Sequence, residues 1–215
     1  MNNLISKENI PVVIERLTEM HPEAKCALDH ESNFQLLAAV VLSAQTTDVS
    51  VNKVPPELFR RYPTAYEMAE ADQQDVCDII RTIGLYKNKS ANLIALSKKL
   101  VEDYNGEVPG TYEELVKLPG VGRKTANVVL AEGFGVPRIA VDTHVFRVAN
   151  RIGLADGKDV TETEEQLMER LPEEQWILAH HLLIFHGRKC CQARNPKCVD
   201  NCLIKEYCKY ASQNA

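Results

Sequence analysis

Long hydrophobic runs are missing from this chain of 215 residues. No apolar stretch approaches the roughly 18–20 residues that a membrane-spanning helix needs. The first residues, Met1 to Glu8, contain neither the basic segment nor the apolar segment of a secretory signal. We therefore expect a cytoplasmic protein that does not interact with a membrane.

Glycine and proline are also scarce, with 10 of each, which excludes a collagen-like or largely disordered chain. Alternation of period two is not sustained anywhere, so a sheet is not expected. Apolar residues recur instead at helical spacing, as at Ile10, Val13 and Leu17. These patterns predict an all-α fold with a break or restart at Pro55-Pro56. The expected helices are at about 8–20, 34–42, 64–71, 73–82, 87–104, 111–117, 123–133, 142–152, 161–171 and 173–187.

The net charge of −5 by itself argues against a nucleic-acid binder, whose surface is usually basic. The charges are unevenly distributed, however. Residues 81–101 carry five Lys and Arg and no acid, residues 186–209 carry six against two acids, and residues 156–174 carry eight acids against two bases. Such segregation is compatible with one positive face on an acidic molecule.

Five of the seven cysteines fall between Cys190 and Cys208. In a reducing compartment such a group indicates metal binding before disulfides. Four of them, spaced C-x6-C-x3-C-x5-C, provide the thiolates that a [4Fe–4S] cluster needs, with zinc as the alternative; they are Cys191, Cys198, Cys202 and Cys208. Cys190 is an extra thiol that could replace Cys191. The isolated Cys26 and Cys77 are expected to be buried core thiols.

A tight turn is predicted at residues 118–122, Leu-Pro-Gly-Val-Gly, where Gly120 and Gly122 allow positive φ and close backbone approach. The helix that follows from about Arg123 offers unpaired N–H groups and a partial positive charge, which suit a phosphate. Lys117, Arg123 and Lys124 would surround that position. An ordinary helical corner with solvated lysines is the alternative.

Several blocks of the chain together resemble the endonuclease III branch of the helix-hairpin-helix DNA glycosylases. They run in the family's order through nearly the whole chain, from about residue 34 to 208. The blocks are Leu42–Asp48 (LSAQTTD), Ile83–Tyr86 (IGLY), Leu118–Asn127 (LPGVGRKTAN), Ile139–Arg147 (IAVDTHVFR), and His180-His181 followed by His186-Gly187-Arg188. The chain departs from the family's cysteine pattern by one additional residue between Cys198 and Cys202.

This resemblance implies two helical lobes with a DNA-binding cleft between them. A six-helix barrel would comprise residues 24–136, including the hairpin at 118–122. Residues 1–23 and 137–215 would form a discontinuous second lobe with an iron–sulfur loop at 191–208. The expected partner is double-stranded DNA with a damaged or abasic nucleotide, bound by a monomer that would be nucleoid-associated in a bacterium.

The resemblance also implies a reaction. Lys124 matches the family's nucleophile and Asp142 its assisting carboxylate. Breaking an N-glycosidic bond builds positive charge on the sugar, which a carboxylate stabilises, while an uncharged amine attacks C1′ and forms a Schiff base. β-Elimination then cuts the strand 3′ to the abasic site, so a bifunctional glycosylase/AP lyase for oxidised pyrimidines is expected. Structurally, Lys124 could be a solvated helix-start residue and Asp142 a helix cap.

DNA-contact roles carry over in the same way. Gln45 would fill the space that the extruded base leaves, and Leu85 would wedge into the stack. Alternatively, Gln45 is a helix C-cap and Leu85 closes the Arg81–Lys89 corner. Gly120, Gly122 and Arg123 would hold a phosphate at the hairpin. Arg194 and Lys197, between the first two cluster ligands, would contact others.

Two other functions remain open. The chain could be a glycosylase for adenine or thymine mispairs from the same superfamily. Against this, hydrolysis-only branches usually lack the lysine, and the adenine-specific branch carries a catalytic Glu, whereas no acid lies between Ser32 and Thr47. It could also be a non-catalytic iron–sulfur DNA-binding protein.

Overall fold

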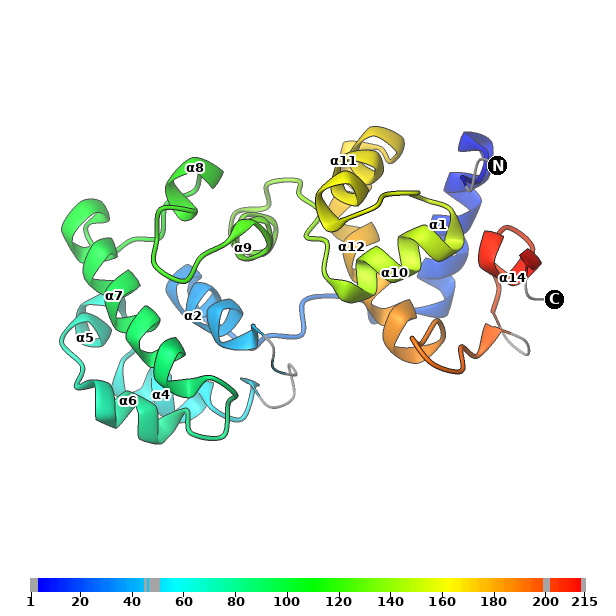
Figure 1. Ribbon diagram of the computed structural model, residues 1–215. Coiled ribbons are helices and arrows are strands. Elements are labelled where there is room, and N and C mark those ends of the chain that lie inside the picture. Colours follow the sequence, from blue (N-terminus) through cyan, green and yellow to red (C-terminus); the bar gives the residue numbers. More distant parts are fainter. Residues whose placement is uncertain (1–3, 45, 47–50, 199–201, 214–215) are drawn as a thin grey trace. The chain divides into compact units, whose positions relative to one another are not determined.

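The computed structural model describes residues 4–44, 46, 51–198 and 202–213. Within these ranges the chain is helical and contains no strand, so the predicted all-α class is confirmed (Figure 1). None of the described helices is both long and apolar enough to span a bilayer.

The chain forms two compact units. One consists of Met1–Cys26 together with Pro137–Ala215, and the other of Ala27–Val136. The expected lobe boundaries are at residues 23/24 and 136/137.

The unit at 27–136 is built around a buried helix, α2, in which every residue from Phe34 to Leu42 is buried. Ser32 caps it by accepting a hydrogen bond from the Gln35 amide at 3.2 Å, as the sequence predicts. Helices α4, α7 and α9 pack against α2. The helices of this unit are α2 (Asn33–Ser43), α4 (Pro55–Arg61), α5 (Ala65–Ala69), α6 (Gln73–Ile79), α7 (Tyr86–Tyr104), α8 (Tyr112–Leu115) and α9 (Arg123–Phe134).

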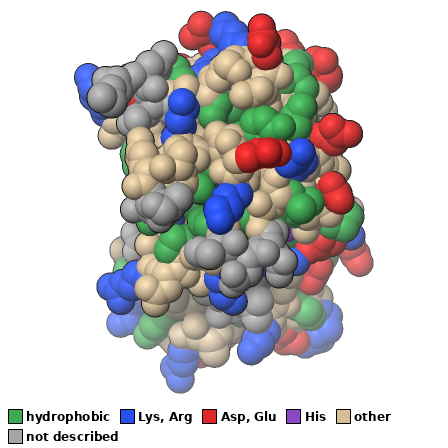
Figure 2. All heavy atoms as spheres, turned by 90° about the vertical axis from the view of Figure 1, so that its right-hand side faces the viewer, with side chains coloured by type: hydrophobic (Ala, Val, Ile, Leu, Met, Phe, Trp, Pro, Cys, Tyr) green, Lys and Arg blue, Asp and Glu red, His purple; other side chains and the backbone are tan. Residues whose placement is uncertain are grey.

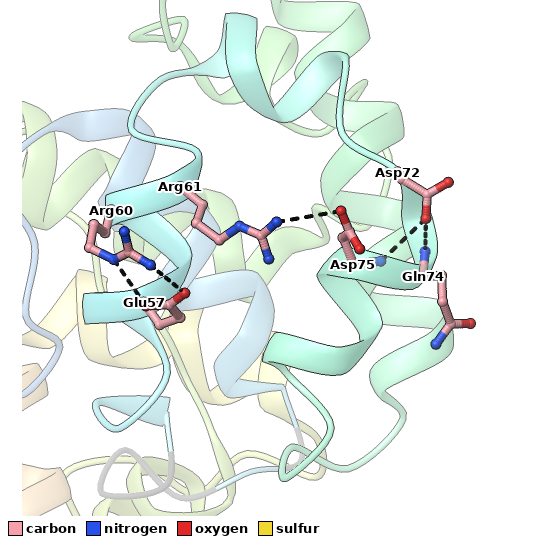
Figure 3. Close-up of polar contacts among 6 residues, drawn as sticks. All are labelled: Glu57, Arg60, Arg61, Asp72, Gln74 and Asp75. Atoms are coloured by element: carbon pink, nitrogen blue, oxygen red, sulfur yellow. Dashed lines mark hydrogen bonds and ion pairs between the residues drawn. The ribbon is translucent and has the colours of Figure 1, made fainter.

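Helix α4 begins at the Pro55-Pro56 pair, so the expected restart is observed. Proline suits the first turn of a helix because its missing N–H would have no partner there. Arg61 of α4 pairs with Asp75 of α6 at 3.5 Å, which links the two helices at their surfaces (Figure 3). Asp72 caps α6 through the Gln74 amide at 2.8 Å and the Asp75 amide at 3.3 Å.

The second unit is organised around α10, which packs on α11, α12 and α14. Val145, Val148, Ala149 and Ile152 form the apolar face of α10 and are buried. The helices of this unit are η1 (Lys7–Asn9), α1 (Ile10–Met20), α10 (Thr143–Ile152), α11 (Val160–Arg170), η2 (Glu173–Gln175), α12 (Trp176–Lys189) and α14 (Lys209–Gln213). Among the described residues of this unit, the short α14 is a helix that the apolar spacing did not indicate.

Candidate functional site

The predicted hairpin lies between α8 and α9. Gly120 adopts a φ of +78°, and a Cβ there would lie 3.0 Å from two atoms of the Asn92 side chain. Gly122 differs, because its φ is −98° and a Cβ added there would meet nothing within 4 Å. The turn therefore requires glycine at 120, whereas glycine at 122 keeps the approach to α9 open.

Helix α9 starts without a side-chain cap. Its first intrahelical bond runs from the Ala126 amide to the Gly122 carbonyl at 2.9 Å, so the preceding amides of Arg123, Lys124 and Thr125 lie in the first turn. Arg123 and Lys124 are exposed there. This is the geometry of an anion-binding helix start.

Lys117, the third base expected around the hairpin, forms an ion pair. Its Nζ pairs with Glu114 of α8 at 2.6 Å, and both side chains are exposed. The cations next to the hairpin glycines are thus Arg123 and Lys124, and Lys117 is partnered one turn earlier.

Asp142 caps α10 in the other unit. Its Oδ1 accepts hydrogen bonds from the backbone amides of His144 and Val145, each at 2.8 Å, and neither bond uses Oδ2. Asp142 is half-buried. The cap therefore holds the carboxylate in one orientation through a single oxygen.

His144 follows directly in the first turn of α10. Burial is the main cause that lowers its pKa, although Asp142 acts in the opposite direction. Arg147 Nη2 lies 3.2 Å from His144 Nδ1, and because a guanidinium can only donate, Nδ1 is the acceptor.

Leu85 lies at the start of α7 with a φ of +59° and 56% of its surface exposed. Left-handed backbone costs about 1–2 kcal/mol for a non-glycine residue, and an exposed leucine recovers little by burial. The alternative interpretation, a small hydrophobic contact that closes the Arg81–Lys89 corner, would leave more than half of the residue exposed. The DNA-contact role of Leu85 remains a prediction that this strained and exposed position is compatible with.

Gln45 lies outside the described residues. Nearby, Lys89 of α7 is 5% exposed and donates from Nζ to Thr46 Oγ1 at 2.8 Å. Burial lowers the pKa of Lys89. This lysine was counted in the basic segment 81–101, but it does not contribute to a positive surface.

The cysteine loop is tied to α10 by two arginines. Arg147 donates to the Cys191 carbonyl at 3.2 Å and to the Gly187 carbonyl at 3.0 Å. Arg151 Nη1 lies 3.6 Å from Cys191 Sγ, and the Cys208 thiol donates to the Arg151 carbonyl at 3.5 Å. The first and last predicted cluster ligands therefore meet at Arg151.

A second group of donors was not anticipated. His186 Nε2, Cys190 Sγ and Cys202 Sγ all lie within 4.8 Å of one another and could hold a metal ion. A hydrogen bond from Cys190 and the nearby His186 lower the pKa of the Cys202 thiol to about 4. The spacing His186-x3-Cys190 is a signal that could have placed the two on one helix face, but nothing in the sequence shows that Cys202 returns to them.

The remaining cysteines differ from each other. Cys77 is buried beside Ser90, with 3.0 Å between Sγ and Oγ, as a core thiol should be. Cys26 is only half-buried, so the expectation of a core position is wrong for it.

Arg194 and Lys197 are both exposed on the loop between Cys191 and Cys198. The Lys197 amide donates to the Cys190 carbonyl at 2.9 Å, which fixes the backbone beneath the side chain. Figure 2 shows one face of the molecule on which acidic and basic side chains are partly segregated, with the acids gathered towards its upper and right-hand edges. Positive groups are available on this surface despite the net charge of −5.

Comparison with known proteins supports a common origin. Residues 38–173 match the model of the HhH-GPD superfamily of base excision DNA repair proteins. The chain is 46% identical to endonuclease III of Bacillus subtilis over 96% of this chain and 94% of that protein. It is 48% identical to endonuclease III of Escherichia coli K12, with 92% and 93% covered.

Solved structures agree. A trapped endonuclease III–DNA covalent intermediate has a TM-score of 0.92 at 45% identity, covering 98% of this chain and 99% of that one. A thermostable thymine-DNA glycosylase has a TM-score of 0.85 at 22% identity over 96% of this chain, which shows a shared fold. The chain therefore belongs to the HhH-GPD superfamily of base excision DNA repair proteins, as an enzyme of its endonuclease III family with DNA glycosylase and lyase activity.

Proposed function

We propose that this enzyme removes oxidised pyrimidines from duplex DNA through Lys124 and Asp142, and then cleaves the strand 3′ to the abasic site. The observation that carries the assignment is the exposed Lys124 amine in the first turn of α9, directly after an open hairpin. A phosphate bound by the amides of that turn would hold the DNA backbone beside the amine.

Each residue has a separate task. Departure of the base leaves positive charge on the sugar, and the Asp142 carboxylate stabilises it. The Lys124 amine, once it has lost its proton, bonds to C1′ and the sugar ring opens to a Schiff base. Loss of a C2′ proton then expels the 3′ phosphate, so one lysine accounts for both base removal and strand cleavage. The cap geometry supports this role of Asp142, because its Oδ1 accepts both amide hydrogen bonds and neither bond uses Oδ2.

We also propose that Cys191, Cys198, Cys202 and Cys208 bind a [4Fe–4S] cluster. The donor set fits, since four thiols belong to one loop and Arg151 joins the first to the last. When bound, the cluster would cross-link the loop that carries Arg194 and Lys197. Purified protein should show broad visible absorbance with iron and sulfide, and protein that is colourless and contains zinc would overturn the assignment.

Borohydride trapping tests the catalytic proposal. Reduction of the Schiff base should join the wild-type chain covalently to abasic duplex DNA, and Lys124→Gln should abolish the adduct while leaving DNA binding within a few fold. The Lys117→Gln variant is the matched control, because Lys117 is exposed nearby and paired with Glu114. A mismatch-specific hydrolytic glycosylase would remove a base without trapping, and a non-catalytic binder would do neither.

A further inference from the structure

The group formed by His186, Cys190 and Cys202 shares Cys202 with the proposed cluster ligands, but its other two members, a histidine and the additional cysteine, are not among them. Around a tetrahedral zinc ion, with Zn–S of about 2.3 Å and Zn–N of about 2.0–2.1 Å, the ligand atoms lie roughly 3.5–4 Å apart. Here the three atoms lie within 4.8 Å of one another, and Cys202 Sγ is 3.9 Å from His186 Nε2. One distance therefore already matches zinc coordination, and the other two need at most a small shift of the cysteine side chains.

Two of the three ligands are fixed by helix geometry. His186 lies in α12 and Cys190 is its C-cap, with the Cys190 amide donating to the His186 carbonyl at 2.9 Å. Residues four apart project from the same side of a helix. The Lys197 amide also donates to the Cys190 carbonyl at 2.9 Å, so the backbone at Cys190 is held from both directions.

The imidazole of His186 is already oriented. Its Nδ1 lies 3.1 Å from Nε2 of His21, and both histidines are buried, at 2% and 3% exposed. This contact leaves Nε2 of His186 to face Cys202. Metal-binding histidines are typically oriented by a partner on the other ring nitrogen, and His21 supplies that partner here.

An ion can reach the third ligand from solvent. A cavity of about 520 Å³ includes Cys202 in its lining, so solvent reaches this ligand. It is lined by Arg16, Cys202, Leu203, Lys205, Glu206, Ala211 and Ser212.

We propose that His186, Cys190 and Cys202 bind a single zinc ion when the iron–sulfur cluster is absent. Cys202 cannot serve both metals, so zinc and the cluster exclude each other. Two thiolates and an imidazole suit zinc, which accepts nitrogen and sulfur in tetrahedral sites. Zinc binding here requires none of the catalytic roles of Lys124 and Asp142.

Cobalt(II) is the probe, added to the reduced, cluster-free full-length chain and then displaced by zinc. One equivalent should bind, with thiolate-to-cobalt charge transfer and the strong visible bands of tetrahedral cobalt. Cys190→Ser should weaken binding by more than the roughly 10- to 100-fold expected from His21→Gln, which removes only the orienting partner. Cys77→Ser, a buried thiol of the other unit, should not change the affinity.

Cys191→Ser and Cys208→Ser separate this site from the cluster ligands, with circular dichroism confirming that each variant is folded. Both should bind cobalt as wild type does. Loss of cobalt binding in either, with retention in Cys190→Ser, would overturn the proposal, as would a failure of the wild type to bind. Zinc should also slow reconstitution of the cluster in the wild type but not in Cys190→Ser. Borohydride trapping by the holoenzyme tests the catalytic proposal independently of the zinc site.

Discussion

At the residue scale, Leu85 combines a strained backbone with an exposed apolar side chain. Leu85→Gly should leave stability unchanged or raise it by up to about 1 kcal/mol, because glycine removes left-handed strain but is more flexible when unfolded. Removal of a damaged base should fall about 10-fold or more, since extrusion costs a few kcal/mol and loses its wedge. Single-turnover excision and thermal denaturation measure the two effects.

Asn105 is the matched control for Leu85, because it lies at the other end of α7 with a φ of +52°. Asn105→Gly should leave excision unchanged. Cleavage at a ready-made abasic site should suffer less than excision in Leu85→Gly, since no base has to be extruded. Equal losses on both substrates would argue against the wedge.

The two roles of Asp142 can be separated by Asp142→Asn. Asparagine caps a helix about as well as aspartate, so stability should change by no more than about 0.5 kcal/mol. The negative charge is lost, and base removal should fall by roughly 10²–10³, which is typical for loss of a preorganised stabilising group. Chemical denaturation and single-turnover kinetics provide the comparison. If Asp142→Asn loses activity only to the extent that it lowers the free energy of unfolding, Asp142 acts as a cap alone.

At the element scale, the hairpin assigns different tasks to its two glycines. Gly120→Ala should destabilise the protein by about 1–2 kcal/mol, because its φ is +78° and Asn92 lies 3.0 Å from the new Cβ. Gly122→Ala has open space and an ordinary φ, so its cost should stay below about 1 kcal/mol. DNA affinity should nevertheless fall in Gly122→Ala, because the methyl group would occupy the approach to the amides of α9. Normal affinity in that variant would place the phosphate elsewhere.

Local signals predicted most of the helices because each depends on residues close in the sequence. Apolar spacing indicated α1 and α10, Ser32 indicated the start of α2, and the proline pair indicated the start of α4. The cysteine spacing likewise indicated one metal-binding loop. The contacts that escaped prediction join distant residues, as in His21 with His186 and Cys202 with Cys190.

Exposure was also hard to predict from type alone. Lys89 was expected on a basic surface, yet its long side chain is buried and its amine reaches the Thr46 hydroxyl. Leu85, expected either to wedge into DNA or to close a corner of the fold, is exposed although leucine is usually buried. In both cases tertiary packing, which a single sequence does not reveal, decided against the usual preference of the residue.

At the scale of the whole molecule, an acidic chain must bind a polyanion through local positive groups. Arg194→Gln and Lys197→Gln should each weaken binding uniformly across sequences and reduce the slope of log affinity against log salt by about 1. Both side chains are exposed on a loop whose backbone is held at Cys190. Binding titrations at several salt concentrations measure the slope.

Lys158→Gln distinguishes local contacts from overall charge. Lys158 is exposed among the acids of residues 156–174. Its replacement changes the net charge of −5 by the same amount as Arg194→Gln or Lys197→Gln does. If Arg194 and Lys197 bind phosphates and Lys158 does not, the slope for Lys158→Gln should remain that of the wild type, because a charge that contacts no phosphate releases no counterion. If all three variants reduce the slope of log affinity against log salt by the same amount, the loop makes no specific phosphate contact. Total charge alone then governs the affinity.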